Sequence, residues 1–104
     1  MKIHRYMTKG IQETLPIELQ FFIWELQINL RATKKDIDYL QIYNLSTISK
    51  GFCTLQVIHH EAENPKYNAF YYLEPEKCME DKIYIITDNY EDYSVETMLF
   101  ASEY

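Results

Sequence analysis

The stretch LPIELQFFIWELQINL, residues 15–30, decides the fold, because its apolar residues are dense enough to cover two sides of a helix. At 100° per residue they fall into two opposed stripes. The first stripe consists of Ile17, Phe21, Trp24 and Ile28. The second stripe consists of Leu19, Phe22, Ile23, Leu26 and Leu30. A surface helix usually has one apolar face, so this helix, expected over residues 15–31, should make two apolar contacts.

Two interpretations of the stripes stay open. In the first, both are internal: one packs on a sheet, and the N-terminal strand or the C-terminal segment covers the other. In the second, the stripe of Ile17, Phe21, Trp24 and Ile28 faces a second copy or another protein, since a large apolar patch rarely stays bare on a monomer. Trp24 and Phe21 would then be the anchor pair, because aromatic residues dominate interface energetics.

The rest of the chain has the two-residue alternation and the turn residues typical of strands. We expect strands at 36–48, 52–61, 66–74 and 82–88, a short β-prone segment within 3–11 that closes at Gly10, and a last strand rather than a helix within 94–104. Thr14 is the expected N-cap of the helix, with Pro16 in its first turn. The sequence therefore predicts one α+β domain, residues 1–104. Its antiparallel sheet of four to six strands has one long helix packed across one face.

Charge is distributed unevenly along this chain, whose net charge is −6. Residues 1–60 carry seven Lys/Arg and five Asp/Glu, whereas residues 61–104 carry three lysines and eleven acids. Phosphate contacts need Lys and Arg, so we expect no direct nucleic-acid binding but a good fit to a basic groove on a protein. Neither a membrane span nor a signal sequence is visible. We therefore expect a cytoplasmic protein of a bacterium or a bacterial host cell.

Acidic residues and tyrosines gather in residues 74–93. Carboxylates on a rigid domain can imitate phosphates, and tyrosines give contact area at low entropic cost. We expect a partner-binding surface made of Glu74, Glu76, Glu80, Asp81, Asp88, Tyr90, Glu91, Asp92 and Tyr93. The alternative is that these acids only keep the protein soluble.

VIHHEAEN, residues 57–64, is the stretch that most resembles a metal site. On a strand, His59 and Glu61 share one face while His60 points to the other, and two convergent side chains are too few for zinc. We therefore expect no metal and no cofactor. Cys53 should be a buried structural cysteine, and both Cys53 and Cys78 should be reduced. No nucleophile motif and no phosphate-binding loop is present, so we expect a protein that is not an enzyme.

Several segments together resemble the uncharacterised domain-of-unknown-function family 960 of low-GC Gram-positive bacteria and their phages. The matching segments are RYMTKGIQETLPIELQFFIWEL (5–26), DYLQIYNL (38–45), VIHHEAENPKY (57–67) and TMLFASEY (97–104). They cover about half of the chain, in family order. The resemblance implies a bacterial or phage-borne protein, and it carries over no activity and no catalytic residue.

Together these observations predict a non-enzymatic protein-binding module. The phage setting implied by the resemblance points further, to an inhibitor of a host defence nuclease, similar to an anti-CRISPR protein. Its acidic, tyrosine-rich surface would occupy the basic nucleic-acid groove of the nuclease. One alternative is a housekeeping bacterial interaction protein that forms a homodimer through its helix. Another is a metal-dependent enzyme centred on His59, His60 and Glu61.

Overall fold

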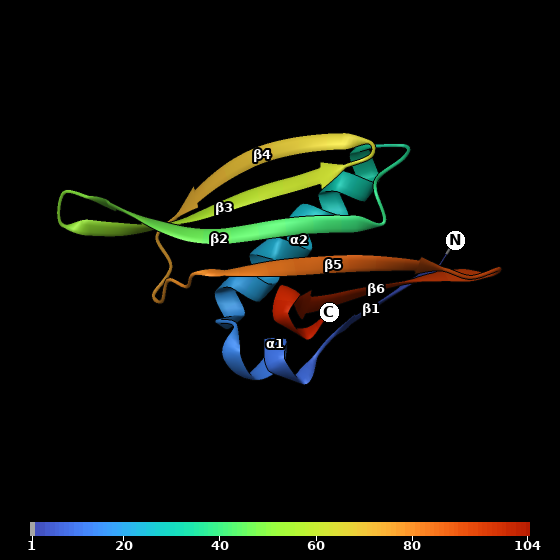
Figure 1. The fold of residues 1–104 in the computed structure, drawn as a ribbon, viewed down its shortest axis with the longest axis horizontal. Coiled ribbons are helices and arrows are strands. Elements are labelled where there is room, and N and C mark those ends of the chain that lie inside the picture. Colours follow the sequence, from blue (N-terminus) through green and yellow to red (C-terminus); the bar gives the residue numbers. More distant parts are fainter. Residues whose placement is uncertain (1) are drawn as a thin grey trace.

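The computed structural model describes residues 2–104 as a six-stranded sheet with helices on one face (Figure 1). The N-terminal elements are β1 (Lys2–Met7), α1 (Lys9–Thr14) and α2 (Ile17–Thr33). The other strands are β2 (Leu40–Lys50), β3 (Cys53–Glu63), β4 (Lys66–Leu73), β5 (Asp81–Asn89) and β6 (Tyr93–Phe100). A 3-10 turn, η1 (Ala101–Glu103), follows β6. All the predicted strands are present, with ends that differ by a few residues from those expected.

The sheet is mixed, so the prediction of a purely antiparallel sheet is wrong. Its order is β1-β6-β5-β2-β3-β4, and β1 pairs with β6 in parallel whereas every other pair is antiparallel. The strands β1 and β2 run in the same direction, because α1 and α2 carry the chain back between them, as parallel strands require. The hairpin of β5 and β6 is inserted between β1 and β2. Because β6 is antiparallel to β5, which is antiparallel to β2, it must run parallel to β1.

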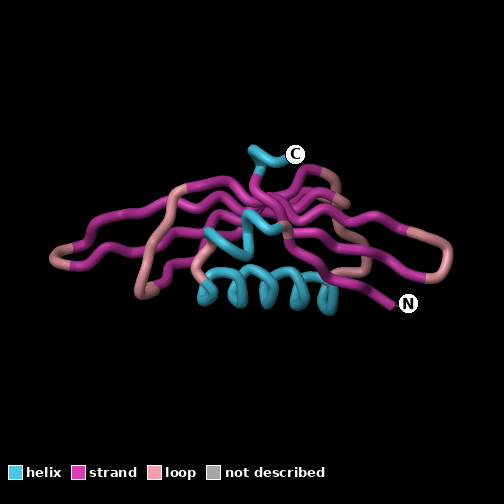
Figure 2. Tube along the Cα trace, turned by 90° about the horizontal axis from the view of Figure 1, so that it is seen from below, coloured by secondary structure: helices cyan, strands magenta, loops and turns pink. Residues whose placement is uncertain are grey.

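The long helix α2 lies across one face of the arched sheet (Figure 2), as predicted. Leu19 and Ile23 of α2 have no exposed surface, and they belong to one cluster with Tyr43 from β2 and Ile83 from β5. The second stripe of α2 therefore meets the sheet. The C-terminal segment lies on the opposite face, where the ring of Tyr104 meets that of Tyr84 edge-on at 5.8 Å.

Residues 9–14 form a helix, α1, where a β-prone segment closing at Gly10 was expected. Thr8 caps this helix, because its side-chain oxygen accepts a hydrogen bond from the backbone N–H of Ile11 at 3.2 Å. The side chain of Ile11 is fully buried in the core. Thr14 therefore ends α1 and does not cap α2, whose N-cap is Pro16.

The hairpin of β2 and β3 extends beyond the rest of the sheet (Figure 1). Neither β4 nor β5 pairs with its last residues, Thr47–Leu55, so both edges of the tip lack a neighbouring strand, and residues 48–54 are exposed. Cys53 lies in this tip and is exposed, so the prediction of a buried structural cysteine is wrong. Gly51 makes the two-residue turn, where its φ of +63° suits glycine better than other residues.

Candidate functional site

The first stripe of α2 is the largest apolar feature left uncovered on the helix. Ile17, Phe21 and Ile28 are 62%, 68% and 44% exposed, whereas Trp24 is half-buried and packs against the core. These four positions follow one another at intervals of 4, 3 and 4 residues, the spacing of a coiled-coil seam. The interpretation in which both stripes are buried inside the chain is therefore wrong for the first stripe. The outer face of α2 is an exposed apolar ridge.

An acidic border lies beside the N-terminal end of this ridge. The backbone N–H of Glu76 donates a hydrogen bond to the Glu18 carboxylate at 3.2 Å. Glu74 and Glu18 also line one shallow hollow together with Phe22. The structure thus brings Glu74 and Glu76, expected in a separate acidic surface, next to Ile17 and the start of α2.

The other predicted surface residues lie along β5 and beyond its two ends. Glu80 and Asp81 are at the start of β5, and Glu80 accepts a hydrogen bond from the Thr47 hydroxyl at 3.1 Å. Asp88 is near the end of β5, followed by Tyr90, Glu91, Asp92 and Tyr93. Since a strand advances by about 3.3 Å per residue, the nine residues of β5 separate the two groups by roughly 26 Å. The predicted acidic surface is therefore two patches and not one.

The turn between β5 and β6 holds its two tyrosines together. The rings of Tyr90 and Tyr93 stack at 5.0 Å, and Tyr93 also meets the ring of His4 edge-on at 5.4 Å. Glu91 and Asp92 are exposed at the tip of the turn. This end of the molecule thus presents two carboxylates beside a small aromatic cluster, which is the composition expected for a partner-binding patch.

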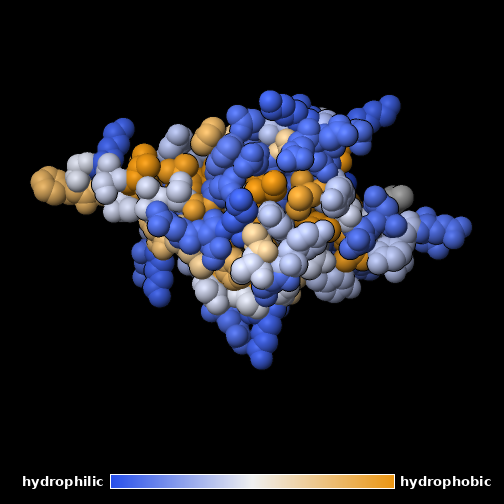
Figure 3. Space-filling model, viewed as in Figure 1, coloured by the Kyte–Doolittle hydropathy of each residue, from blue (hydrophilic) through white to orange (hydrophobic). Residues whose placement is uncertain are grey.

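The sheet face opposite α2 is also rich in apolar side chains. Ile42, Tyr84 and Leu99 lie in one row across β2, β5 and β6, since they oppose one another in the strand register. Strand alternation places this row opposite the buried Tyr43 and Ile83. In Figure 3 hydrophobic side chains form an interrupted band across the middle of this face, bordered by hydrophilic ones. Part of the band is covered by the C-terminal segment through Tyr104.

A buried carboxylate beneath α2 links the helix to both strands of the β1–β6 pair. Glu96 has no exposed surface and accepts hydrogen bonds from Arg5 at 2.9 Å, from Gln27 at 2.8 Å and from Arg31. The Tyr43 hydroxyl donates to Gln27 at 2.6 Å, and burial and the nearby Glu96 raise the pKa of this phenol well above its usual value. Within residues 2–104, no buried side-chain nitrogen or oxygen of this network lacks a partner, so the network ties α2 firmly to β1 and β6.

The two histidines of the VIHH stretch lie on opposite faces of β3, as strand alternation predicted. His59 stacks on Phe70 at 4.2 Å and hydrogen-bonds Asn68. His60 is buried, stacks on Tyr43 at 4.1 Å and donates from Nε2 to the Gln41 side-chain oxygen at 2.8 Å, while its Nδ1 has no partner among residues 2–104. Burial lowers the pKa of His60 to about 4, with a smaller effect from His59. His60 is therefore a neutral core residue.

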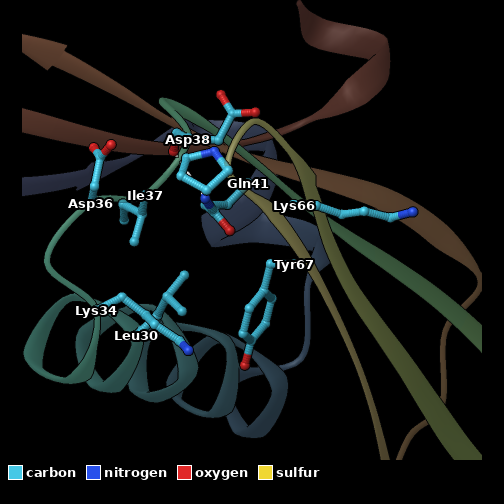
Figure 4. Close-up of a pocket in the computed structure, with 9 residues that line it drawn as sticks. Leu30, Lys34, Asp36, Ile37, Asp38, Gln41, Lys66 and Tyr67 are labelled. Atoms are coloured by element: carbon cyan, nitrogen blue, oxygen red, sulfur yellow. Dashed lines mark hydrogen bonds between the residues drawn. The ribbon is translucent and has the colours of Figure 1, made fainter.

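A small pocket opens where the end of α2 faces the start of β2 and β4 (Figure 4). Its walls are Leu30, Ile37, Gln41 and Tyr67, while the Lys66 side chain extends away from it. Asp38, at its rim, has a pKa below the usual value: burial opposes ionisation, but backbone N–H groups from Asn64 and Leu40, among others, outweigh it. A carboxylate of lowered pKa is a poor base, and no Ser, Thr or Cys is among the residues that line this pocket.

Within residues 2–104 no group of three His, Cys, Asp or Glu side chains is arranged to hold a metal ion. In the same range, no helix combines the length and the apolar character that a membrane span needs.

Comparison with known proteins identifies relatives without a known activity. Residues 4–103 match the family model described as "Staphylococcal protein of unknown function (DUF960)". The crystal structure of a protein of unknown function from Enterococcus faecalis has a similar fold, with a TM-score of 0.63 over 97% of this chain and 90% of that chain. At 20% identity this likeness shows the fold alone. No curated protein matches the chain.

Sequence inspection missed the network around Glu96. Its members come from β6, β1 and α2, at sequence separations of 91, 69 and 65 residues from Glu96. The only local signal is that Gln20 and Gln27 lie on the side of α2 next to the buried stripe. Both are buried, and Gln20 donates to the carbonyl oxygens of Ile11 and Leu15 at the end of α1.

Proposed function

The chain belongs to the DUF960 family of staphylococcal proteins, and we propose that it is a non-enzymatic protein-binding module that docks through the outer face of α2. The observation that supports this proposal is the exposed seam of Ile17, Phe21 and Ile28 on a helix held rigidly by its other face. Aromatic and aliphatic side chains that stay on a rigid ridge lose little entropy when they are buried by a partner. They therefore favour binding.

The charges beside the seam indicate what kind of partner it fits. Glu18, Glu74 and Glu76 border its N-terminal end, and Glu25 lies on its flank. Complementary charge raises the rate of association and excludes wrong partners. We therefore propose a partner with an apolar groove bordered by Lys and Arg.

The titratable groups support a non-enzymatic function. The groups whose pKa is shifted mainly by burial, His60, Tyr43 and Tyr71, line none of the pockets described here. Asp38 does line one, but its pKa is lowered, which makes it a weak base. An active site places its perturbed groups where a substrate can reach them. In the described residues these groups instead stabilise the fold.

A host defence nuclease is the more specific partner that we propose. The groove in which such a nuclease holds nucleic acid is basic, and an anti-CRISPR-like inhibitor from a phage or mobile element would occupy it. The turn with Tyr90, Glu91, Asp92 and Tyr93 would supply a second acidic contact. The acidic residues at the two ends of β5 lie roughly 26 Å apart, so a groove that engages both ends would have to extend over at least that length.

The proposal is tested by a matched pair of variants. Phe21→Asp places a charge on the seam, and Phe52→Asp places the same charge on the distant hairpin tip, where Phe52 is fully exposed. Both should keep the circular dichroism spectrum of the wild type. We expect Phe21→Asp to weaken binding by at least about tenfold. Binding is measured as capture of the partner from a Gram-positive lysate and as inhibition of a purified CRISPR effector nuclease. Phe52→Asp should leave both the capture and the inhibition unchanged. Equal binding by the two variants would contradict the proposal.

The nuclease proposal has its own test. Replacing both Glu91 and Asp92 by Lys should abolish inhibition of the nuclease and reverse the salt dependence of binding, because like charges would then face each other. If the variant inhibits as well as the wild type and with the same salt dependence, the acidic turn takes no part in binding.

A homodimer through α2 is the second candidate, because the coiled-coil spacing of the seam also fits a second copy of the same helix. Sedimentation distinguishes the two: this candidate predicts a dimer that Phe21→Asp dissociates, whereas the first predicts that Phe21→Asp leaves the oligomeric state unchanged.

A further inference from the structure

The edge strand β4 has, beyond Lys66 at its start, none of the residues that usually protect a sheet edge. It lies at one border of the sheet and pairs only with β3, so its outer N–H and C=O groups have no strand beside them (Figure 1). From Tyr67 to Leu73 it contains no charge, no proline and no glycine. The opposite edge, β1, is six residues long and carries Lys2, His4 and Arg5. Long, uncharged edges of this kind pair readily with another strand.

We propose that a second copy of this chain pairs with β4 in antiparallel orientation, so that the two sheets join into one. A symmetric dimer uses the same patch on both copies, and two identical strands meet around a two-fold axis only if they are antiparallel. With the axis perpendicular to the sheet, each residue on the open face meets a residue on the open face of the second copy.

Charge complementarity selects one register. When Phe70 lies opposite Phe70 of the second copy, Lys66 lies opposite Glu74 of that copy at both ends of the paired segment. Both side chains are exposed, and they are the charged residues nearest to either end of β4. Shifting the axis to Asn68 or Tyr72 places Lys66 opposite Phe70 or Cys78 instead. An axis at Tyr71 would place Lys66 opposite Glu76, but it would carry the pairing past Pro75, which has no N–H to donate to a neighbouring strand. Opposite charges at directly paired positions stabilise antiparallel strands.

The same register also brings apolar side chains together. Phe70 and Tyr72 are 53% and 58% exposed on the open face, and Phe70 already stacks on His59. Pairing would place the two Phe70 rings side by side and cover part of each Tyr72 ring. On the other face, Tyr67 would meet Leu73 of the second copy. No like charges oppose each other within the paired strands.

The dimer would leave both α2 ridges free and on the same side of the joined sheet. Since α2 lies across one face of the sheet and the two-fold axis keeps the faces aligned, a partner would meet two ridges at once. The pairing of β4 does not depend on what binds α2.

Charge exchange tests this register. An interface formed by one pair of strands is small, so sedimentation equilibrium should be measured up to about 200 µM protein. We expect the wild type to dimerise reversibly, Lys66→Glu and Glu74→Lys each to weaken the dimer at least tenfold, and the double variant K66E/E74K to restore it. Phe70→Lys should abolish it, and Phe21→Asp should leave it unchanged. Circular dichroism verifies that each variant is folded.

Other outcomes would overturn the proposal. A wild type that is monomeric over the whole range shows that β4 does not pair with a second copy. If Phe21→Asp dissociates the dimer and Phe70→Lys leaves it intact, the dimer forms through α2 and not through β4. If Phe70→Lys dissociates the dimer while both charge variants and the double variant leave it intact, β4 pairs in a different register from the one proposed.

Discussion

His60 shows how position in the fold changes the chemistry of a single residue. In the sequence it stands in VIHHEAEN, beside groups that can bind metal or transfer protons. In the structure its ring lies between Tyr43 and Tyr67, its Nε2–H is bonded to Gln41, and its Nδ1 has no partner within the described residues. A proton on Nδ1 would place an uncompensated charge in the core.

Stability should therefore fall on mild acidification. The pKa of His60 is about 4 in the folded chain and 6.5, the ordinary histidine value, in the unfolded chain, so the unfolded chain takes up a proton between these values while the folded chain does not. Below pH 6.5 the free energy of unfolding should decrease as pH falls, by up to roughly 3 kcal/mol at pH 4. We expect His60→Gln to reduce this slope in urea unfolding. His59→Gln, its matched control, should retain most of it, because His59 makes the smaller contribution to the lowered pKa, and equal slopes in both variants would contradict the prediction.

At the scale of the element, α2 has one face buried in the core and one face exposed to solvent. Its buried face carries Leu19, Ile23 and Leu30 as well as two glutamines, whose hydrogen bonds tie the helix to α1 and to Glu96. Its outer face carries Ile17, Phe21 and Ile28. The same residue type therefore contributes very differently to stability on the two faces.

Two isoleucine truncations measure this difference. Ile23→Ala removes a fully buried side chain and should lower the free energy of unfolding by about 2–5 kcal/mol. Ile28→Ala, on the exposed face, should lower it by about 1 kcal/mol or less. Urea denaturation monitored by circular dichroism provides both values. Similar losses for the two variants would mean that the outer face is covered in solution.

At the scale of the whole molecule, strands from the two ends of the chain pair with each other at one border of the sheet. The parallel pair of β1 and β6 joins residues 2–7 to residues 93–98, and Arg5 reaches across it to Glu96. The core cluster includes residues from α1, α2, β2, β3, β5 and β6. Tyr71 and Leu73 of β4 pack against this cluster from outside. No segment can separate without exposing part of this cluster.

Unfolding should accordingly be a single cooperative transition, as expected for one domain of residues 1–104. The fluorescence of Trp24, which reports on the packing of α2, and far-ultraviolet circular dichroism, which is dominated by the sheet and α2, should give the same urea midpoint. Midpoints that differ beyond experimental error would show that α2 and the sheet unfold separately.

The sequence by itself determined the elements with a regular apolar period. The helical spacing of residues 17–30 and the alternation in residues 40–48 and 82–88 depend on neighbours in the chain, and all three elements lie close to where they were predicted. The opposed orientation of His59 and His60 followed in the same way. The helix α1 was missed because its signal, Thr8 capping Ile11, is a single short contact.

Only the tertiary structure decided which strands are neighbours and which apolar stripe is covered. The insertion of β5 and β6 between β1 and β2 makes the sheet mixed, and it brings Arg5, Gln27 and Arg31 to Glu96 from 65 to 91 residues away. The two stripes of α2 have similar apolar character. Which one is buried depends on the direction from which the sheet approaches, and no local period records that direction.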